Sequence, residues 1–142
     1  MTERQLSAQH YLERYAEAQR RVRWCQEQYD REAYLLDTIR SPSDNDGMPH
    51  GNGIGRPTES KALKLSEKAM DIHKAKQAAR EVMREIFTVA YNVGGIEGDV
   101  LIERYIKLKE WEDVYAAVNY SERQTFRYHN AGLDKVADML DL

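Results

Sequence analysis

The chain has 142 residues, of which 42% are hydrophobic and 32% charged, and its formal net charge is −3 at pH 7. No stretch approaches the roughly 18 consecutive apolar residues of a membrane-spanning helix, and the N-terminus shows no basic segment followed by an apolar block. We therefore expect a cytoplasmic protein without a membrane partner, built as one domain or as a small domain with an appendage. The single cysteine, Cys25, excludes an internal disulfide and a multi-cysteine zinc site.

The first predicted element is a long helix over residues 3–40, a stretch that contains no Pro or Gly. Its apolar residues recur with the alternating spacing of three and four that is typical of a coiled coil, and Glu32 is the polar interruption. The residues of this stripe are Tyr11, Tyr15, Ala18, Val22, Cys25, Tyr29, Leu36 and Ile39. Cys25 falls within the stripe, which favours a buried structural thiol.

Residues 41–57 hold all three prolines and four of the eight glycines, so they are predicted to form a loop. No strand precedes these glycines and the P-loop lysine is missing, so a phosphate-binding loop is not indicated. The composition leaves open whether the loop contacts a partner or serves as a linker.

A second long helix is predicted over residues 58–93, with Thr58 as its N-cap and Lys76 as a polar interruption of its apolar stripe. The stripe consists of Leu65, Ala69, Ile72, Ala79, Met83, Ile86, Ala90 and Val93. The two long helices match in length, which predicts an antiparallel, coiled-coil-like hairpin over residues 1–95.

Several apolar residues lie outside both stripes and still require cover. These are Leu12, Trp24, Leu35, Leu63, Met70, Val82 and Phe87. Either the C-terminal part packs back along the hairpin or two chains associate. We therefore predict a homodimer or a higher oligomer that forms mainly through the hairpin.

The C-terminal segment, residues 96–142, is predicted to be a small three-helix domain with a helix-turn-helix. Gly94 and Gly95 end the second long helix, and Asp99 is expected to cap a third helix that runs through Lys107. The helix that follows should bury Trp111, Val114, Tyr115 and Val118. Asn119 tolerates a positive φ angle and Ser121 can cap the next helix, so a tight turn is encoded between them.

In the last helix, the inward stripe is predicted to contain Thr125, Tyr128, the Ala131–Gly132 step, Leu133 and Val136. The opposite face then presents long polar side chains and one aromatic ring, beginning at the helix N-terminus, where such helices touch base edges in double-stranded DNA. The expected DNA-contacting residues are Ser121, Glu122, Arg123, Gln124, Phe126, Arg127, Asn130, Lys109 and Trp111.

The acidic character of the C-terminal segment counts against tight DNA binding, because phosphate neutralisation supplies most of the sequence-independent affinity for DNA. Residues 98–142 carry six basic and nine acidic side chains. We therefore expect weak DNA binding by one isolated chain, and a need for an oligomer, a multi-site operator or RNA polymerase as a second anchor.

The C-terminal third carries a family resemblance. It rests on Leu101, Arg104-Tyr105-Ile106, Trp111-Glu112-Asp113-Val114, Ser121-Glu122-Arg123-Gln124-Thr125, Ala131-Gly132-Leu133 and Lys135. This run resembles the fourth conserved region of bacterial sigma factors. Together with residues 46–51, it resembles small phage-encoded regulators of the ArpU and RinA type. That resemblance implies a transcriptional activator of phage late genes that recognises promoters together with RNA polymerase. Tyr115 departs from the usual pattern, which has Ala or Gly where the two helices cross.

Two other functions remain open: a DNA-packaging adaptor similar to a small terminase subunit, which usually places its DNA reader first, and a helical interaction protein that does not bind DNA. Enzymatic activity is not expected, because no nucleophile lies at a usable spacing from a base. The four histidines have no metal-ligand spacing, so no metal or cofactor is expected.

Overall fold

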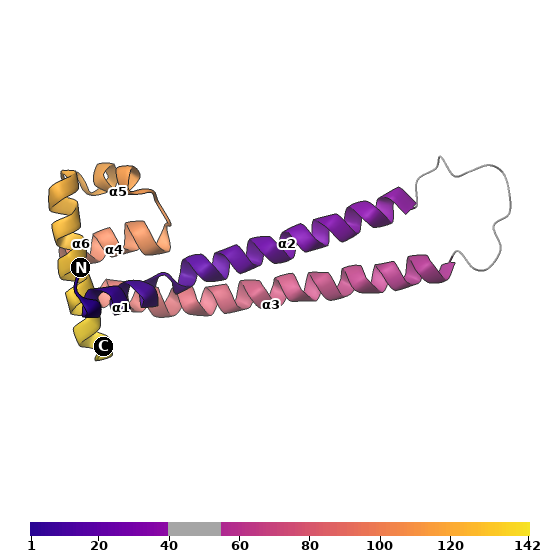
Figure 1. Ribbon diagram of the computed structural model, residues 1–142, viewed down its shortest axis with the longest axis horizontal. Coiled ribbons are helices and arrows are strands. Elements are labelled where there is room, and N and C mark those ends of the chain that lie inside the picture. The colour runs from indigo at the N-terminus through magenta and orange to yellow at the C-terminus, as the bar shows by residue number, and fades with distance from the viewer. Residues whose placement is uncertain (40–54) are drawn as a thin grey trace. The chain divides into compact units, whose positions relative to one another are not determined.

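The computed structural model describes residues 1–39 and 55–142, and within these ranges every regular element is a helix (Figure 1). The all-α fold class is thus confirmed for the described residues. The elements are α1 (Glu3–Leu12), α2 (Arg14–Ile39), α3 (Gly55–Val93), α4 (Gly95–Leu101), the π-helical turn η2 (Ile102–Ile106), α5 (Trp111–Val118) and α6 (Glu122–Leu140). The chain divides into two compact units, residues 1–19 with 78–142 and residues 20–77.

The loop predicted for residues 41–57 lies outside the described residues up to position 54, and its last three residues already belong to α3. The expected N-cap Thr58 is therefore inside α3 and not at its start. Helix α3 begins earlier than glycine and proline composition alone would place it. Proline is well tolerated within a first helical turn, where its missing N–H has no intrahelical partner, and Pro57 lies two residues after the first residue of α3.

A break at Glu13 divides the N-terminal helix that the sequence predicts as continuous. No proline or glycine causes this break. Helix α1 instead packs against α6, where Ala8 and Leu12 are fully buried. Its start is fixed by a capping box in which Thr2 Oγ1 accepts from Gln5 N at 3.2 Å and Thr2 N donates to Gln5 Oε1 at 3.0 Å. Tertiary packing therefore overrides the uninterrupted helical propensity of the sequence.

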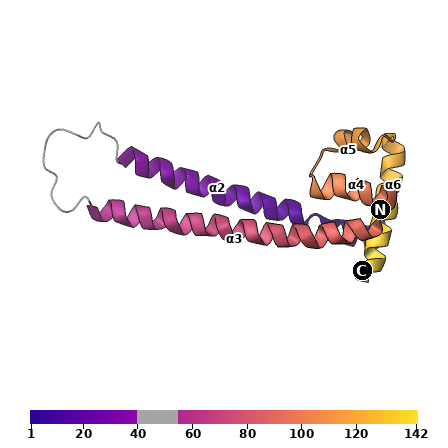
Figure 2. The same ribbon diagram turned by 180° about the vertical axis from the view of Figure 1, so that it is seen from behind.

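In the unit of residues 20–77, the α2 and α3 segments run side by side in opposite directions (Figure 1, Figure 2). Cys25 and Leu36 are buried on α2, as their stripe predicts. On α3 the predicted stripe is displaced by one residue at two places, since Ala75 is buried whereas Lys76 is exposed, and Lys68 is half-buried whereas the predicted Ala69 is exposed. The buried and half-buried positions keep an unbroken spacing of three and four through Leu65, Lys68, Ile72, Ala75 and Ala79. Lys68 is tolerated in this stripe because its aliphatic stem can cover apolar surface while its amine reaches water.

The other unit has one hydrophobic core to which α1, α3, α4, η2 and α6 contribute. Its buried members are Ala8, Leu12, Ile86, Ala90, Leu101, Tyr105, Leu133, Val136 and Ala137. Helix α6 crosses close to α4 at Gly132, where an added Cβ would lie 3.2 Å from Leu101 Cδ1 and 3.4 Å from the carbonyl oxygen of Glu97. This close approach accounts for a glycine in the middle of a helix.

The junction between α3 and α4 is formed by Gly94 and Gly95, whose φ angles of 67° and 60° are in the region that favours glycine. The prediction that these glycines end the second long helix is confirmed. Asp99 does not cap the following helix, however, because α4 begins at Gly95 and Asp99 lies inside it. Helix α4 then widens into η2, where Lys107 N donates to the carbonyl of Ile102, five residues earlier, at 3.0 Å.

Candidate nucleic-acid interface

The turn between α5 and α6 has the local geometry that its residues predict. Asn119 ends α5 in the left-handed region, with φ 60° and ψ 38°. Ser121 is extended, and its Oγ accepts a hydrogen bond from Gln124 N at 3.3 Å. A left-handed C-cap and a serine N-cap satisfy the helix ends on both sides of a three-residue connection, residues 119–121.

The inward face of α6 is largely as predicted. Thr125, Gly132, Leu133 and Val136 are buried, and Val114 of α5 is fully buried opposite them. Tyr128 is only half-buried, and its ring lies 5.0 Å from that of Tyr120 in an edge-to-face contact.

The buried position that the sequence interpretation missed is His129, whose side chain is only 3% exposed. Tyr105 OH lies 2.7 Å from His129 Nε2. Burial lowers the pKa of His129 to about 4, with Arg104 acting in the same direction and Asn130 opposing it. Burial, together with the Glu13 carboxylate, raises the pKa of Tyr105. A neutral imidazole and a protonated phenol follow, so Tyr105 donates to Nε2.

That protonation state leaves the proton of His129 on Nδ1. Nδ1 and the neighbouring Thr125 Oγ1 are both buried without a hydrogen-bond partner among the described residues. The imidazole meets the indole of Trp111 edge-on at 4.9 Å between ring centroids. The imidazole therefore contributes to packing between α5 and α6 as well as to the Tyr105 hydrogen bond. Its place one turn after Thr125 and one turn before Leu133 is the sequence signal that could have revealed it.

Trp111 and Phe126, both expected to contact DNA, belong to an aromatic cluster between α5 and α6. Their ring centroids are 4.7 Å apart, and Tyr115 meets Phe126 edge-on at 5.8 Å. The Arg104 guanidinium lies 4.8 Å from the Trp111 ring. Phe126 is half-buried, so the expectation of a freely exposed aromatic on the reading face is wrong. The cause is the packing of Phe126 against two rings of α5, those of Trp111 and Tyr115.

Lys109, expected to hold a phosphate, is engaged within the protein. Its Nζ lies 2.6 Å from Glu103 Oε2, an ion pair without an aligned hydrogen bond, and Lys107 Nζ lies 2.7 Å from the other carboxylate oxygen. Burial opposes ionisation of Glu103, but the hydrogen bond from Lys107 and the positive charges of both lysines lower the pKa of its carboxyl overall. The carbonyl of Lys109 accepts from Arg104 at 2.8 Å. Because Lys107 and Lys109 share this one carboxylate, the positive charge of Lys109 is only partly compensated.

Asn130 lies where α1 crosses α6. It is half-buried, and its carbonyl is 3.5 Å from Gln5 Nε2, which also donates to Asp134 Oδ1 at 3.0 Å. One turn further, Arg4 pairs with Asp138 at 2.7 Å. Helix α1 thus covers the C-terminal half of α6, and Asn130 marks the edge of the surface that remains open.

The remaining expected contact residues share one exposed surface at the N-terminal end of α6. They are Ser121, Glu122, Arg123, Gln124 and Arg127. Four of them, all except Glu122, line a shallow open hollow. Arg123 and Arg127 are one helical turn apart, and neither forms an ion pair with another described residue. We call this surface, made of these five residues, the α6 N-terminal face.

The first turn of α5 is acidic, in contrast to the two arginines of the α6 N-terminal face. Glu110, Glu112 and Asp113 are exposed there, and no basic side chain lies in that turn. Phosphates would be repelled by this end of α5. Within the α5–α6 pair, phosphate contact is therefore favoured at the α6 N-terminal face and not at the first turn of α5.

No protein family, curated protein or solved structure matches this chain. Among residues 1–39 and 55–142, no three or more His, Cys, Asp or Glu side chains are grouped so that they could hold a metal ion. Within the same ranges, no helix combines the length and the apolar character needed to cross a membrane.

Proposed function

We propose that this protein is a sequence-specific DNA-binding transcriptional regulator. In this proposal α5, the turn and α6 act as a helix-turn-helix, and α6 enters the major groove with its N-terminal end. The antiparallel α2 and α3 segments serve as a hairpin appendage for oligomerisation or for contact with RNA polymerase. The resemblance to sigma region four and to ArpU- and RinA-type regulators supports a role as an activator of phage late genes.

The observation that carries the proposal is the α6 N-terminal face. Arg123 and Arg127 are exposed and unpaired among the described residues, while Thr125 and His129 on the opposite side anchor the helix in the core. Arginine can donate two hydrogen bonds to guanine, and Gln124 can pair with adenine in the same way. A rigid helix that presents these donors without intramolecular competition is suited to reading base edges.

The contacts within the unit reduce the number of residues that we propose for DNA contact. Arg123, Gln124 and Arg127 remain candidates for base contact, and Ser121 is available for a phosphate through its exposed position. Trp111 and Phe126 support the helix pair instead, through their mutual packing. Lys109 is a weaker candidate for phosphate binding than a free lysine would be, because its amine is held by the Glu103 carboxylate that it shares with Lys107.

A DNA selection experiment tests the proposal. The purified full-length chain is incubated with a random double-stranded library, with and without RNA polymerase, and bound sequences are determined. We expect a defined sequence motif to be enriched, and its enrichment to increase when polymerase is present, since one acidic unit has little affinity for phosphates. Enrichment of no motif under either condition would exclude the function.

A second candidate is a helical interaction protein that binds no DNA. It is favoured by the acidic first turn of α5 and by the stacked pair Phe87 and Tyr91, which are 41% and 70% exposed with ring centroids 6.0 Å apart. The same selection separates the two candidates, because an interaction module would enrich no DNA motif.

A further inference from the structure

The unit of residues 20–77 exposes a second surface on α2, on the side away from the buried Cys25 and Leu36. Trp24 is 54% exposed, Tyr34 71% and Leu35 43%. Large apolar side chains gathered on one helix face are typical of an interaction site. Nothing among the described residues covers them.

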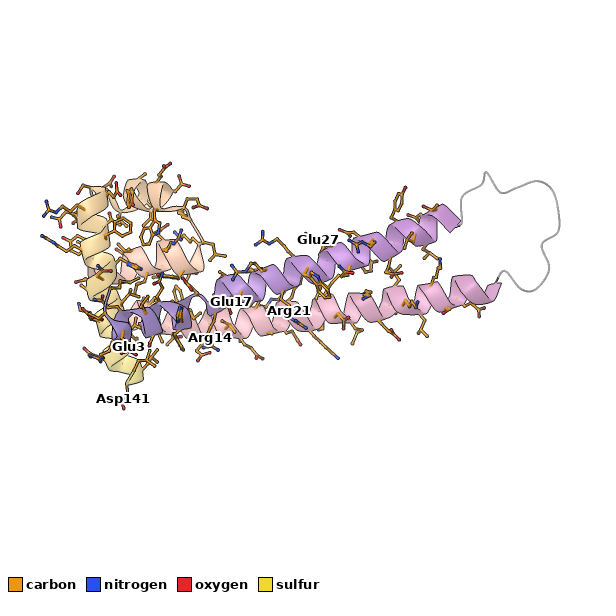
Figure 3. The ribbon with its side chains drawn as sticks, viewed as in Figure 1. Glu3, Arg14, Glu17, Arg21, Glu27 and Asp141 are labelled. Atoms are coloured by element: carbon orange, nitrogen blue, oxygen red, sulfur yellow. The ribbon has the colours of Figure 1, made fainter. Side chains whose placement is uncertain are left out.

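Two opposite charges lie between these apolar side chains. Glu27 and Arg31 are exposed, and neither forms an ion pair with a described residue (Figure 3 labels Glu27 on α2). Gln28, which is half-buried, lies on the same side. We call the set Trp24, Glu27, Gln28, Arg31, Tyr34 and Leu35 the outer α2 surface.

The order of these residues along the helix is self-complementary. Turning α2 about a two-fold axis at the level of residue 29 places position 24 opposite position 34, and position 27 opposite position 31. The indole then meets the phenol ring, and the carboxylate meets the guanidinium. Both contacts occur twice, because a two-fold axis repeats every contact.

We propose that the outer α2 surface binds the same surface of a second copy of this chain, with the two α2 helices antiparallel. Two Trp24–Tyr34 contacts form the apolar part of the interface, with Leu35 beside them. Two Glu27–Arg31 ion pairs between the copies fix the register. This inference does not depend on DNA binding, since it uses only residues of α2.

The mixture of charges favours a second copy over other partners. A nucleic acid would be repelled by Glu27, and an anionic lipid surface would gain little from one arginine flanked by an acid. A second copy related by a two-fold axis places an arginine opposite Glu27 and a glutamate opposite Arg31. Electrostatic complementarity of this kind sets register and excludes wrong partners more than it adds affinity.

Charge reversal tests the interface by sedimentation velocity on the full-length chain. Glu27→Arg places two arginines opposite each other at both sites, and Arg31→Glu does the same with two glutamates. We expect each variant to raise the dimer dissociation constant at least about tenfold. Mixing the two variants should restore dimers, because the mixed pair regains both ion pairs, and the double variant should dimerise by itself.

Lys74→Glu on α3 is the matched control, since Lys74 is an exposed charge away from the outer α2 surface, and it should leave the dissociation constant unchanged. Restoration by mixing also shows that the single variants are folded. A wild-type chain that stays monomeric at tens of micromolar overturns the proposal. So does a dimer that tolerates both single reversals, or one that mixing does not restore.

Discussion

The two halves of α6 differ in what surrounds them, although one helix provides both. The C-terminal half is covered by α1 and contributes Leu133, Val136 and Ala137 to the core. The N-terminal half is held along its inner edge by Thr125 and His129 and by the packing of Phe126 against α5, and it exposes Arg123 and Arg127. Stability and recognition can therefore be changed separately within one helix.

The largest effect is expected in the covered half. Leu133→Ala should lower the free energy of unfolding by about 2–5 kcal/mol, because Leu133 is fully buried and the truncation leaves a cavity. Urea denaturation followed by circular dichroism measures this change. Met139→Ala is the control on the same helix, since that side chain is 47% exposed, and it should cost far less. Equal losses from both variants would remove the distinction between core and surface in this half.

His129, which lies between the two halves of α6, should make the free energy of unfolding depend on pH. Its pKa is about 4 in the folded chain against an ordinary value of 6.5, so between these values the unfolded chain binds a proton that the folded chain does not. The free energy of unfolding should therefore fall as the pH drops from about 6.5 towards 4, by up to about 3 kcal/mol. Denaturation at a series of pH values measures the slope.

His129→Gln should flatten this slope, whereas His10→Gln, at an exposed position, should keep it. If the wild-type slope survives in His129→Gln, another group is responsible for it. Glu103 contributes only at the lower end of this window, since a carboxyl whose pKa is lowered from 4.5 loses its stabilising effect as the pH falls through and below that value.

In the open half, substitutions should change binding and not folding. Arg127→Ala should weaken binding to the selected DNA by about 1–3 kcal/mol and relax specificity at one position, while the free energy of unfolding changes by less than about 0.5 kcal/mol. Fluorescence anisotropy with the selected duplex and its single-base variants measures both properties of binding. Arg84→Ala, an exposed arginine on α3, is the control. DNA binding that survives both Arg123→Ala and Arg127→Ala would show that this face is not a reader.

The smallest effect is expected from the ion pair that joins α1 to α6. Arg4 contacts Asp138 at 2.7 Å and the carbonyl of Leu142 at 2.9 Å, but both charged side chains are more than half exposed. Arg4→Ala should therefore cost at most about 1 kcal/mol in a thermal denaturation experiment. A loss as large as that from Leu133→Ala would mean that charge, and not apolar burial, holds α1 in place.

Features that depend on a few neighbouring residues could be predicted from the sequence. The α5–α6 turn follows from Asn119 and Ser121, and the end of α3 from Gly94 and Gly95, because each residue sets its own backbone geometry or its own cap. The capping box of Thr2 and Gln5 was equally local, and its spacing was present in the sequence to be found.

Features that depend on distant packing could not be predicted in this way. The break at Glu13 has no local cause and reflects burial of Ala8 and Leu12 against segments far along the chain. The burial of His129 depends on Tyr105, 24 residues earlier, whose hydroxyl supplies the partner that a buried imidazole needs. The half-burial of Phe126 could not be predicted because it depends on how the rings of Trp111 and Tyr115 on the neighbouring helix pack against it. The function and contact residues of the reading face stay predictions.

The π-helical turn η2 takes up one residue more than an α-helical turn. Lys107 N donates to the carbonyl of Ile102, five residues earlier, whereas an α-helix pairs residues four apart. The extra residue is absorbed within this single wide turn, so the segments before and after it keep nearly the orientation that a regular α-helical turn with one residue fewer would give them. Deleting one residue between 102 and 106 should therefore restore α-helical pairing and leave Leu101 in the core.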